Sequence, residues 1–290
     1  MRLVTFDAGS GARAGAILAD GTRIVDLASA DEGIPQTVLG VLRAGPDMHS
    51  RVAAVIAEPD PKAIHDLASV RLHAPVPVPG AILCIGYNYR GHNAKGKTER
   101  PEYPEVFAKM GNTIIGSDDA ILLPRASDQI DYEGELGVVI GRTAAGVSEA
   151  DALSYVAGYT VFNDVSARDV QNRGSQWILG KSFDTFGPMG PALVTADEVP
   201  DPQNLDITVR SNDNITVRST TADMVFPVAY LISYLSSIIT LQPGDLIATG
   251  SPARTPDIGE VDRFMQAGDT VSITFGSLGT LVNRVQGPPT

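Results

Sequence analysis

Two glutamates separated by one residue, Glu133 and Glu135, have the spacing in this chain that most directly indicates chemistry. They precede the apolar run 136–141, which predicts a buried strand. Side chains two positions apart in a strand point to the same face, so both carboxylates would lie together. Crowded carboxylates in a partly dry place repel each other, and a hard cation such as Mg²⁺, Ca²⁺ or Mn²⁺ relieves the repulsion. The alternative is a solvated strand face that carries two acids without a ligand.

Two further residues are placed to complete such a site. Asp164 follows a predicted strand at 156–162, where it could supply a third carboxylate. Alternatively, Asp164 caps the helix that comes next. Lys181, in a glycine-rich segment at 174–182, would be a fixed cation beside the acidic site, or it would simply pair with Asp184.

His92 is the candidate general base. It follows a predicted buried strand at 81–85, within a turn that also contains tyrosines, and loops at strand ends commonly carry functional residues. The polar stretch 94–104 predicts a loop that closes over this histidine. The remaining histidines lie in the first quarter of the chain, where no other chemistry is visible: His49, His65 and His73.

The composition of the whole chain limits its partners. The chain has 290 residues, a formal net charge of -12 at pH 7 and a pI of about 4.7. Acidity without a basic run argues against nucleic acid or an anionic membrane as the main partner. A single cysteine excludes an intrachain disulfide framework, and the first residues lack the apolar core of a signal peptide, so we expect a cytoplasmic protein. No apolar run is long enough to span a bilayer.

Alternating prolines at 74–80 mark the clearest linker and predict a domain boundary. Residues 1–74 are expected to form a small accessory N-terminal domain, with short strands near 3–6, 14–18 and 23–27 and two short helices within 37–57. Residues 75–290 are expected to form a metal-dependent catalytic domain. Its later part predicts a hairpin at 205–209 and 215–219, a helix within 226–239 and a strand at 268–275.

Six motifs, in order, resemble those of the fumarylacetoacetate hydrolase family, and the likeness runs from about residue 75 to the end of the chain. The motifs are Cys-Ile-Gly-x-Asn-Tyr-x-x-His (84–92), Asp-Tyr-Glu-x-Glu-Leu (131–136), Asn-Asp-Val-Ser-Ala-Arg-Asp-x-Gln (163–171), Gly-Lys-Ser-Phe-Asp-Thr-Phe-x-Pro-Met-Gly-Pro (180–191), Leu-x-Pro-Gly-Asp (241–245) and Thr-Gly-Ser-Pro (249–252). The resemblance implies a β-rich α+β fold, a mixed β-sandwich roll with a small N-terminal domain, and a homodimer.

The resemblance also implies roles for individual residues. Mg²⁺ or Mn²⁺ would be held by Glu133, Glu135 and Asp164. Lys181 would neutralise enolate charge and His92 would activate water. The substrate would be contacted by Tyr89, Arg90, Gln171, Thr249 and Gly250.

Two departures from the family pattern concern substrate choice. Family hydrolases often carry a glutamate three residues after the histidine, where this chain has Lys95; Glu99, Glu102 and Glu105 are the candidate substitutes. After Thr249-Gly250, Ser251 replaces the usual threonine and Ala253-Arg254 replaces a glycine-rich continuation.

The predicted function is that of a divalent-metal-dependent hydrolase, which cleaves a C–C bond in a β-diketo, acylpyruvate-like 2-oxo acid. A decarboxylase, isomerase or dehydratase acting on a 2-oxo, 2-hydroxy-dienoic or deoxy sugar acid through the same metal enolate is the first alternative. A metal-binding protein without catalysis is the second.

Overall fold

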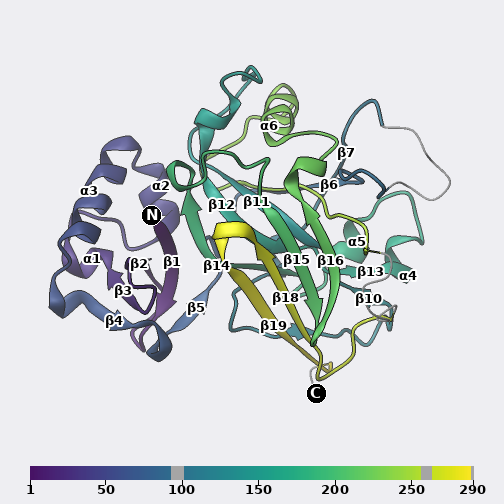
Figure 1. The fold of residues 1–290 in the computed structure, drawn as a ribbon, viewed down its shortest axis with the longest axis horizontal. Coiled ribbons are helices and arrows are strands. Elements are labelled where there is room, and N and C mark those ends of the chain that lie inside the picture. Colours follow the sequence, from purple (N-terminus) through teal and green to yellow (C-terminus); the bar gives the residue numbers. More distant parts are fainter. Residues whose placement is uncertain (93–100, 256–262, 289–290) are drawn as a thin grey trace.

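Two packed β-sheets form the body of the protein, with short helices around them (Figure 1). The computed structural model describes residues 1–92, 101–255 and 263–288. Strands outweigh helices, and the sheets mix parallel pairs, such as β17 (Leu246–Ala248) with β6 (Ile82–Gly86), and antiparallel pairs, such as β11 (Gly134–Ile140) with β12 (Val156–Asn163). The predicted β-rich α+β fold, with a small N-terminal part beside a larger β-sandwich, is confirmed.

The larger sheet has twelve strands within the described residues and crosses the whole molecule. Its main path runs β4 (Ile64–Asp66), β3 (Arg23–Asp26), β2 (Arg13–Ile17), β1 (Arg2–Asp7), β14 (Gly187–Thr195), β12 (Val156–Asn163), β11 (Gly134–Ile140), β17 (Leu246–Ala248), β6 (Ile82–Gly86) and β7 (Glu105–Ala108). Two short strands pair off this path, β5 (Arg71–His73) with β1 and β8 (Ile114–Ile115) with β14.

The second sheet has five strands among the described residues and packs on the larger one. Its order is β16 (Asn214–Thr220), β15 (Asp206–Ser211), β18 (Thr270–Phe275), β19 (Thr280–Gln286) and β9 (Ile121–Leu122). A separate pair, β10 (Ile130–Asp131) and β13 (Ser166–Ala167), lies next to the predicted acidic site.

The helices are short. The α-helices are α1 (Leu27–Ala30), α2 (Val38–Arg43), α3 (Pro46–Ala57), α4 (Arg168–Gln171), α5 (Ile178–Lys181) and α6 (Val228–Ser236). Single 3-10 turns cover Pro61–Ala63, Leu67–Ser69, Gly111–Thr113, Ala152–Tyr155, Ala196–Glu198, Thr221–Asp223 and Gly276–Leu278. No helix in the described part of the chain has the length and apolar character needed to cross a bilayer.

Alternation along β11 separates two hydrophobic cores. Leu136, Val138 and Ile140 belong to the core between the two sheets, whereas Val139 faces a second core on the opposite side of the larger sheet. Glu135 has the same parity as Val139, so it points to the second side. Because a period of two is strict in a strand, the apolar pattern of β11 also determines where this carboxylate points.

The predicted N-terminal domain is joined to the rest of the chain by strand pairing. Arg2 and Leu3 of β1 lie opposite Val194 and Leu193 of β14, so the larger sheet continues across the predicted boundary. Leu3 also lies in the second core together with Cys84 of β6. In Figure 1 residues 1–74 gather at one side of the molecule, beside β14. The division at residue 74 stays a prediction.

Most predicted elements are confirmed, including the break between α2 and α3 at Gly45 and the β15–β16 hairpin. The chief omission is β14, which contains two glycines and two prolines and was not predicted as a strand. Glycine and proline usually indicate turns, and local sequence does not reveal that β14 gains neighbours from two distant segments, β1 and β12.

Leu3→Ala tests whether the N-terminal strands and the main sheet unfold together. Leu3 is 1% exposed, and a buried Leu→Ala change costs about 2–5 kcal/mol. The unfolding midpoint reported by the only tryptophan, Trp177, should fall by the same amount as that reported by far-ultraviolet circular dichroism. Val282→Ala, at an exposed position of β19, is the control. An unchanged Trp177 midpoint would show that the two parts unfold independently.

Candidate metal centre and active site

Three carboxylates converge at one end of the paired strands β11 and β12. Glu133 precedes β11, Glu135 is its second residue, and Asp164 directly follows β12. The strands pair with Gly134 opposite Asn163, and the Asp164 amide donates to the Glu133 carbonyl at 2.9 Å. One oxygen from each of the three carboxylates lies within 4.8 Å of the others. The structure thus brings together the three predicted ligands, although Asp164 caps no helix, since the N-cap of α4 is Ala167.

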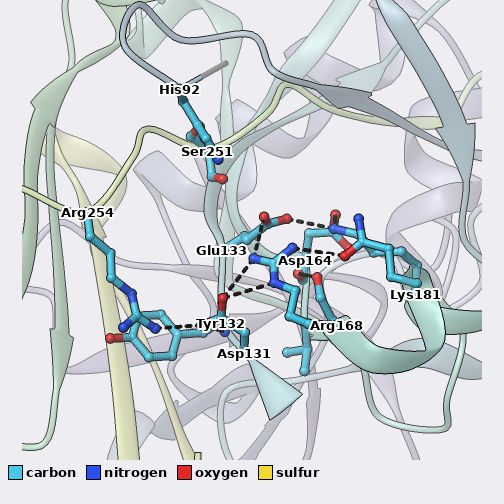
Figure 2. A network of polar contacts seen from close by, with 12 residues as sticks. His92, Asp131, Tyr132, Glu133, Asp164, Arg168, Lys181, Ser251 and Arg254 are labelled. Atoms are coloured by element: carbon cyan, nitrogen blue, oxygen red, sulfur yellow. Dashed lines mark hydrogen bonds and ion pairs between the residues drawn. The ribbon is translucent and has the colours of Figure 1, made fainter. Parts of the chain in front are cut away.

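Three cations surround two of these carboxylates. The Lys181 ammonium donates to Glu133 Oε2 at 2.6 Å and to Asp164 Oδ2 at 2.5 Å. Lys109 donates to the other oxygen of Asp164, Oδ1, at 2.6 Å. Arg168 Nη2 donates to Glu133 Oε1 at 2.7 Å (Figure 2). Lys181 therefore faces the acidic site and does not pair with Asp184, which accepts a hydrogen bond from Asn112.

Glu133 and Glu135 experience opposite electrostatic environments. Burial would raise the pKa of Glu133, but Arg168 and Lys181 outweigh burial and hold that pKa well below its ordinary value. Burial raises the pKa of Glu135 well above its ordinary value, and repulsion from Asp164 and Glu133 adds to the effect. Among the described residues, Glu135 accepts a hydrogen bond from the Gly250 amide at 2.9 Å and forms no ion pair.

A divalent cation fits this arrangement because Glu135 is 1% exposed and, within the described ranges, lacks the cationic partners that the other two carboxylates have. An ionised carboxylate in such a place is costly unless a positive charge compensates it. Three carboxylate oxygens are donors typical of a hard cation whose other positions hold water or substrate. The residues present thus form a candidate site for a divalent metal.

Lys109 is a member of the site that lies in no recognised motif and that the sequence did not reveal. It follows β7, and its side chain is fully buried. Its ammonium donates to Asp164 Oδ1 and to the Val165 carbonyl, at 2.6 and 3.0 Å. Burial lowers the pKa of Lys109 and the Asp164 charge opposes this effect. The only sequence signal is a lysine at the end of an apolar strand, which is equally typical of a strand that enters solvent.

Arg168 and Asp131 extend the network away from the carboxylates. Arg168 Nη2 lies 2.8 Å from Asp131 Oδ2, and Arg254 Nη2 lies 2.7 Å from the other oxygen of Asp131. Figure 2 shows Arg168 between Asp131 and Glu133, with Arg254 on the far side of Asp131 from Lys181. Arg168 and Asp131 lie within recognised motifs, but neither was assigned a role from the sequence.

His92 is held by a backbone group. Its Nδ1 lies 2.7 Å from the Ser251 carbonyl, and its ring meets the Tyr87 ring edge to face at 6.0 Å. A carbonyl oxygen only accepts hydrogen bonds, so Nδ1 carries the proton in the neutral ring and Nε2 retains its lone pair. Among the described residues the imidazole is therefore oriented by a carbonyl and not by a carboxylate. Lys95 and Glu99 lie outside the described residues.

The predicted substrate contacts divide into two groups. Gln171 lines the same cavity as the carboxylates, and its side-chain oxygen accepts from Arg168 Nη1 at 3.1 Å. Thr249 is buried and donates to the Leu136 carbonyl, while the next residue, Gly250, contacts Glu135 through its amide.

Tyr89 and Arg90, in contrast, line neither of the two cavities near the carboxylates. Tyr89 is fully buried in the core between the sheets. The Arg90 side chain is 73% exposed and lies 3.9 Å from Asp223. Their roles as substrate contacts stay predictions.

Two cavities meet at the centre of the site. The first, about 250 Å³, is lined by the three carboxylates, Lys181, Gln171 and an aromatic wall of Tyr87, Phe107 and Trp177. The second, about 320 Å³, extends toward Tyr132, Arg254 and Phe264. Four residues line both cavities: His92, Glu133, Arg168 and Ser251.

Comparison with known proteins identifies relatives over nearly the whole chain. Residues 81–286 match the family model described as fumarylacetoacetate (FAA) hydrolase C-terminal. A fumarylacetoacetate hydrolase domain-containing protein 2 homolog from Dictyostelium discoideum is 43% identical over 301 residues, covering 99% of this chain and 97% of that protein. An oxaloacetate tautomerase, Fahd2a, mitochondrial, from Rattus norvegicus is 40% identical over 266 residues, covering 91% of this chain and 84% of that protein.

Solved structures include a protein with the same fold and a metal. The crystal structure of maleylpyruvate hydrolase from Sphingobium sp. SYK-6, in complex with manganese(II) ion and pyruvate, is 32% identical. It matches with a TM-score of 0.80, and the match covers 100% of both chains.

Glu135→Gln tests whether the unpaired carboxylate prepares the site for a metal. A carboxyl group whose pKa is higher in the folded state makes folding less favourable as pH rises above its unfolded value of about 4.3. We would measure the free energy of unfolding in urea with a chelator present. As pH rises from about 4.3, this free energy should increase for Glu135→Gln relative to wild type.

Adding Mn²⁺ should reverse this order at neutral pH. Wild type should gain about 2.7 kcal/mol at a hundredfold excess of free metal over Kd, and Glu135→Gln should gain much less. Glu149→Gln, at an exposed position, is the control. If Mn²⁺ stabilised wild type and Glu135→Gln equally, Glu135 would not be a metal ligand.

Proposed function

Because the chain belongs to the fumarylacetoacetate hydrolase family, we propose that it is a divalent-metal-dependent tautomerase, which interconverts the keto and enol forms of oxaloacetate or a closely related 2-oxo acid. A relative that aligns with 91% of the chain is named as an oxaloacetate tautomerase. The observation that carries the proposal is the bond from His92 Nδ1 to the Ser251 carbonyl. In the neutral ring this bond places the proton on Nδ1 and the lone pair on Nε2, and His92 lines the cavity of the three carboxylates.

Enolisation needs a base for a carbon-bound proton and positive charge for the oxygen that becomes negative. A Mg²⁺ or Mn²⁺ ion held by Glu133, Glu135 and Asp164 would supply Lewis acidity toward the 2-oxo group. His92 Nε2 would take a proton from C3 of the substrate. The Lys181 ammonium, which lines the cavity, would stabilise the enolate oxygen. Return of the proton from His92 to that oxygen completes an isomerisation in which water is no reactant.

Lys181 suits the electrostatic role better than that of a base. Burial alone would lower the pKa of Lys181, but Asp164 and Glu133 outweigh burial and raise it. The side chain consequently remains an ammonium at neutral pH. Arg168 and Gln171 line the same cavity and have donor groups for the substrate carboxylate.

C–C bond hydrolysis of an acylpyruvate-like acid is the second candidate. The manganese and pyruvate complex of maleylpyruvate hydrolase has this fold, and pyruvate is a 2-oxo acid. Hydrolysis would require His92 to activate water, a task for which family hydrolases often provide a glutamate partner. Among the described residues His92 has the Ser251 carbonyl in place of such a partner.

We propose a homodimer, on the family resemblance, and light scattering at several concentrations tests it. We also keep a cytoplasmic location for this chain, although the relative from Rattus norvegicus is named mitochondrial.

Oxaloacetate tautomerisation by three variants tests the proposed roles. With Mn²⁺ present, His92→Ala should lower kcat by about 10²–10⁴-fold while manganese binding, followed by calorimetry, is retained. Lys181→Met should lower kcat by about 10²–10³-fold, because the enolate charge loses its cation. His49→Ala, in the N-terminal part, is the control. Rates would be followed by exchange of the C3 protons for deuterium.

Two outcomes would contradict the proposal. A wild-type exchange rate in His92→Ala would exclude His92 as the base. Cleavage of an acylpyruvate by wild type, without exchange on oxaloacetate, would favour the hydrolase.

A further inference from the structure

Asn88 is a buried polar residue beside the candidate site that the proposed mechanism does not use. It lies in the turn between β6 and His92, and it is fully buried. Its Nδ2 donates to the Thr249 carbonyl at 2.7 Å and to the Phe226 carbonyl at 3.1 Å, and its Oδ1 accepts from the Phe226 amide at 2.8 Å. One side chain thus connects three segments that are distant in sequence.

We propose that Asn88 is a positioning residue, which fixes the Thr249–Gly250 peptide so that the candidate metal ligand Glu135 and the candidate base His92 keep their places relative to each other. The inference rests on the proposed function only in taking His92 as the base. Its effects on metal binding and on the tautomer of His92 do not depend on which reaction the protein catalyses.

The Thr249–Gly250 peptide is held at both of its polar ends. Its carbonyl accepts from Asn88, and its N–H, which belongs to Gly250, donates to Glu135 Oε2 at 2.9 Å. A donor at the carbonyl polarises the peptide and strengthens its N–H as a donor. Glu135 is buried and forms no ion pair among the described residues, so this hydrogen bond orients its carboxylate before a metal binds.

Glycine at position 250 makes a support for this peptide necessary. Gly250 has a φ of +92°, and glycine adopts positive and negative φ about equally readily, so sterics alone do not fix the orientation of the preceding peptide. If the peptide rotated by half a turn, the Thr249 carbonyl would face Glu135 in place of the N–H. Oxygens brought together in a buried place repel, and the carboxylate would be displaced. The Asn88 donor opposes this rotation, because the rotation would leave Nδ2 without one of its partners.

The same side chain also helps to position the candidate base. Asn88 lies in the turn that carries His92, and its own carbonyl accepts from the Val225 amide at 2.7 Å, which holds this turn against the segment before α6. Ser251, whose carbonyl lies 2.7 Å from His92 Nδ1, directly follows the peptide that Asn88 holds. Both partners of that hydrogen bond are therefore placed by segments that Asn88 joins.

Asn88→Leu tests the inference, because leucine has a similar size and no hydrogen-bonding groups. The Kd of Mn²⁺, measured by calorimetry, should rise about 10–100-fold, the usual effect of removing a partner that orients a metal ligand. In the Mg²⁺-loaded protein, nitrogen-15 NMR should show the neutral His92 ring shifting from the Nδ1-protonated tautomer toward a mixture of both tautomers. His92→Ala assigns the signal among the four histidines.

The rate of the proposed reaction provides a third measurement. At a Mn²⁺ concentration that saturates the variant, kcat for exchange of the C3 protons of oxaloacetate should fall about 10²-fold, as expected for a base displaced by about 1 Å. KM should change little, because Asn88 lines neither of the two cavities near the carboxylates.

Asn283→Leu is the matched control. Asn283 is 2% exposed and also donates through Nδ2 to two carbonyl oxygens, those of Gly116 and Asp119, at 2.9 and 3.0 Å. It lines neither of the two cavities near the carboxylates. The variant should lose a similar amount of stability, but its Mn²⁺ affinity, its His92 tautomer and its kcat should equal those of wild type.

The outcomes distinguish this inference from the proposed function. Either a wild-type Mn²⁺ affinity or an unchanged His92 tautomer in Asn88→Leu would overturn the inference. Equal losses of Mn²⁺ affinity in Asn88→Leu and Asn283→Leu would also overturn it, because they would reflect general destabilisation. If wild type exchanged no proton of oxaloacetate while Mn²⁺ affinity and the tautomer still depended on Asn88, the proposed function would fail and this inference would stand. If Asn88→Leu does not fold, Asn88→Ser, whose hydroxyl ends one bond short of Nδ2, decides by the same measurements.

Discussion

The crowding of Glu133, Glu135 and Asp164 is the constraint on which the rest of the site depends. Three carboxylate oxygens within 4.8 Å of one another, in a mostly buried place, repel strongly unless positive charge surrounds them. The pairing of β11 with β12 imposes this proximity. The same pairing forms the backbone hydrogen bonds of both strands and buries their apolar residues, and this stabilisation holds the carboxylates together. The fold thus maintains an arrangement that the side chains alone would not adopt.

The cations around the carboxylates differ in whether their side chains line the metal cavity. Lys109 lies behind Asp164, fully buried, and lines neither of the two cavities, so it can act on a ligand only through Asp164. Lys181 and Arg168 line the metal cavity and can face a substrate directly. Because Lys109 already binds Oδ1 of Asp164, this carboxylate has a defined orientation before any metal arrives. Lys109 is accordingly a positioning residue.

The sequence predicted the parts of the site that local patterns encode. The Glu-x-Glu spacing on an apolar strand indicated two neighbouring carboxylates, because side chains two apart share a face. A strand end made Asp164 a candidate third carboxylate, with helix capping as the alternative, and the family resemblance assigned it to the metal site. Lys109 was missed because its neighbours at Asp164 come from pairing between strands distant in sequence, which no local pattern reveals. Tyr89 shows the opposite kind of error, in which sequence proximity suggests a contact. This tyrosine lies three residues from the predicted base, but its side chain is in the core between the sheets and does not line the cavity.

A single short segment connects the metal cluster, the base and the second cavity. The Gly250 amide donates to Glu135, the Ser251 carbonyl accepts from His92, and Arg254 bonds to Asp131. Gly250 has a φ of +92°, and a Cβ there would lie 2.8 Å from Asn88 Cβ, so a side chain at this position would be strained and would clash. Because the segment that carries the Ser251 carbonyl also carries Arg254, a change in its backbone acts on His92 and on the second cavity together. The position of the candidate base and the shape of this cavity are therefore physically coupled.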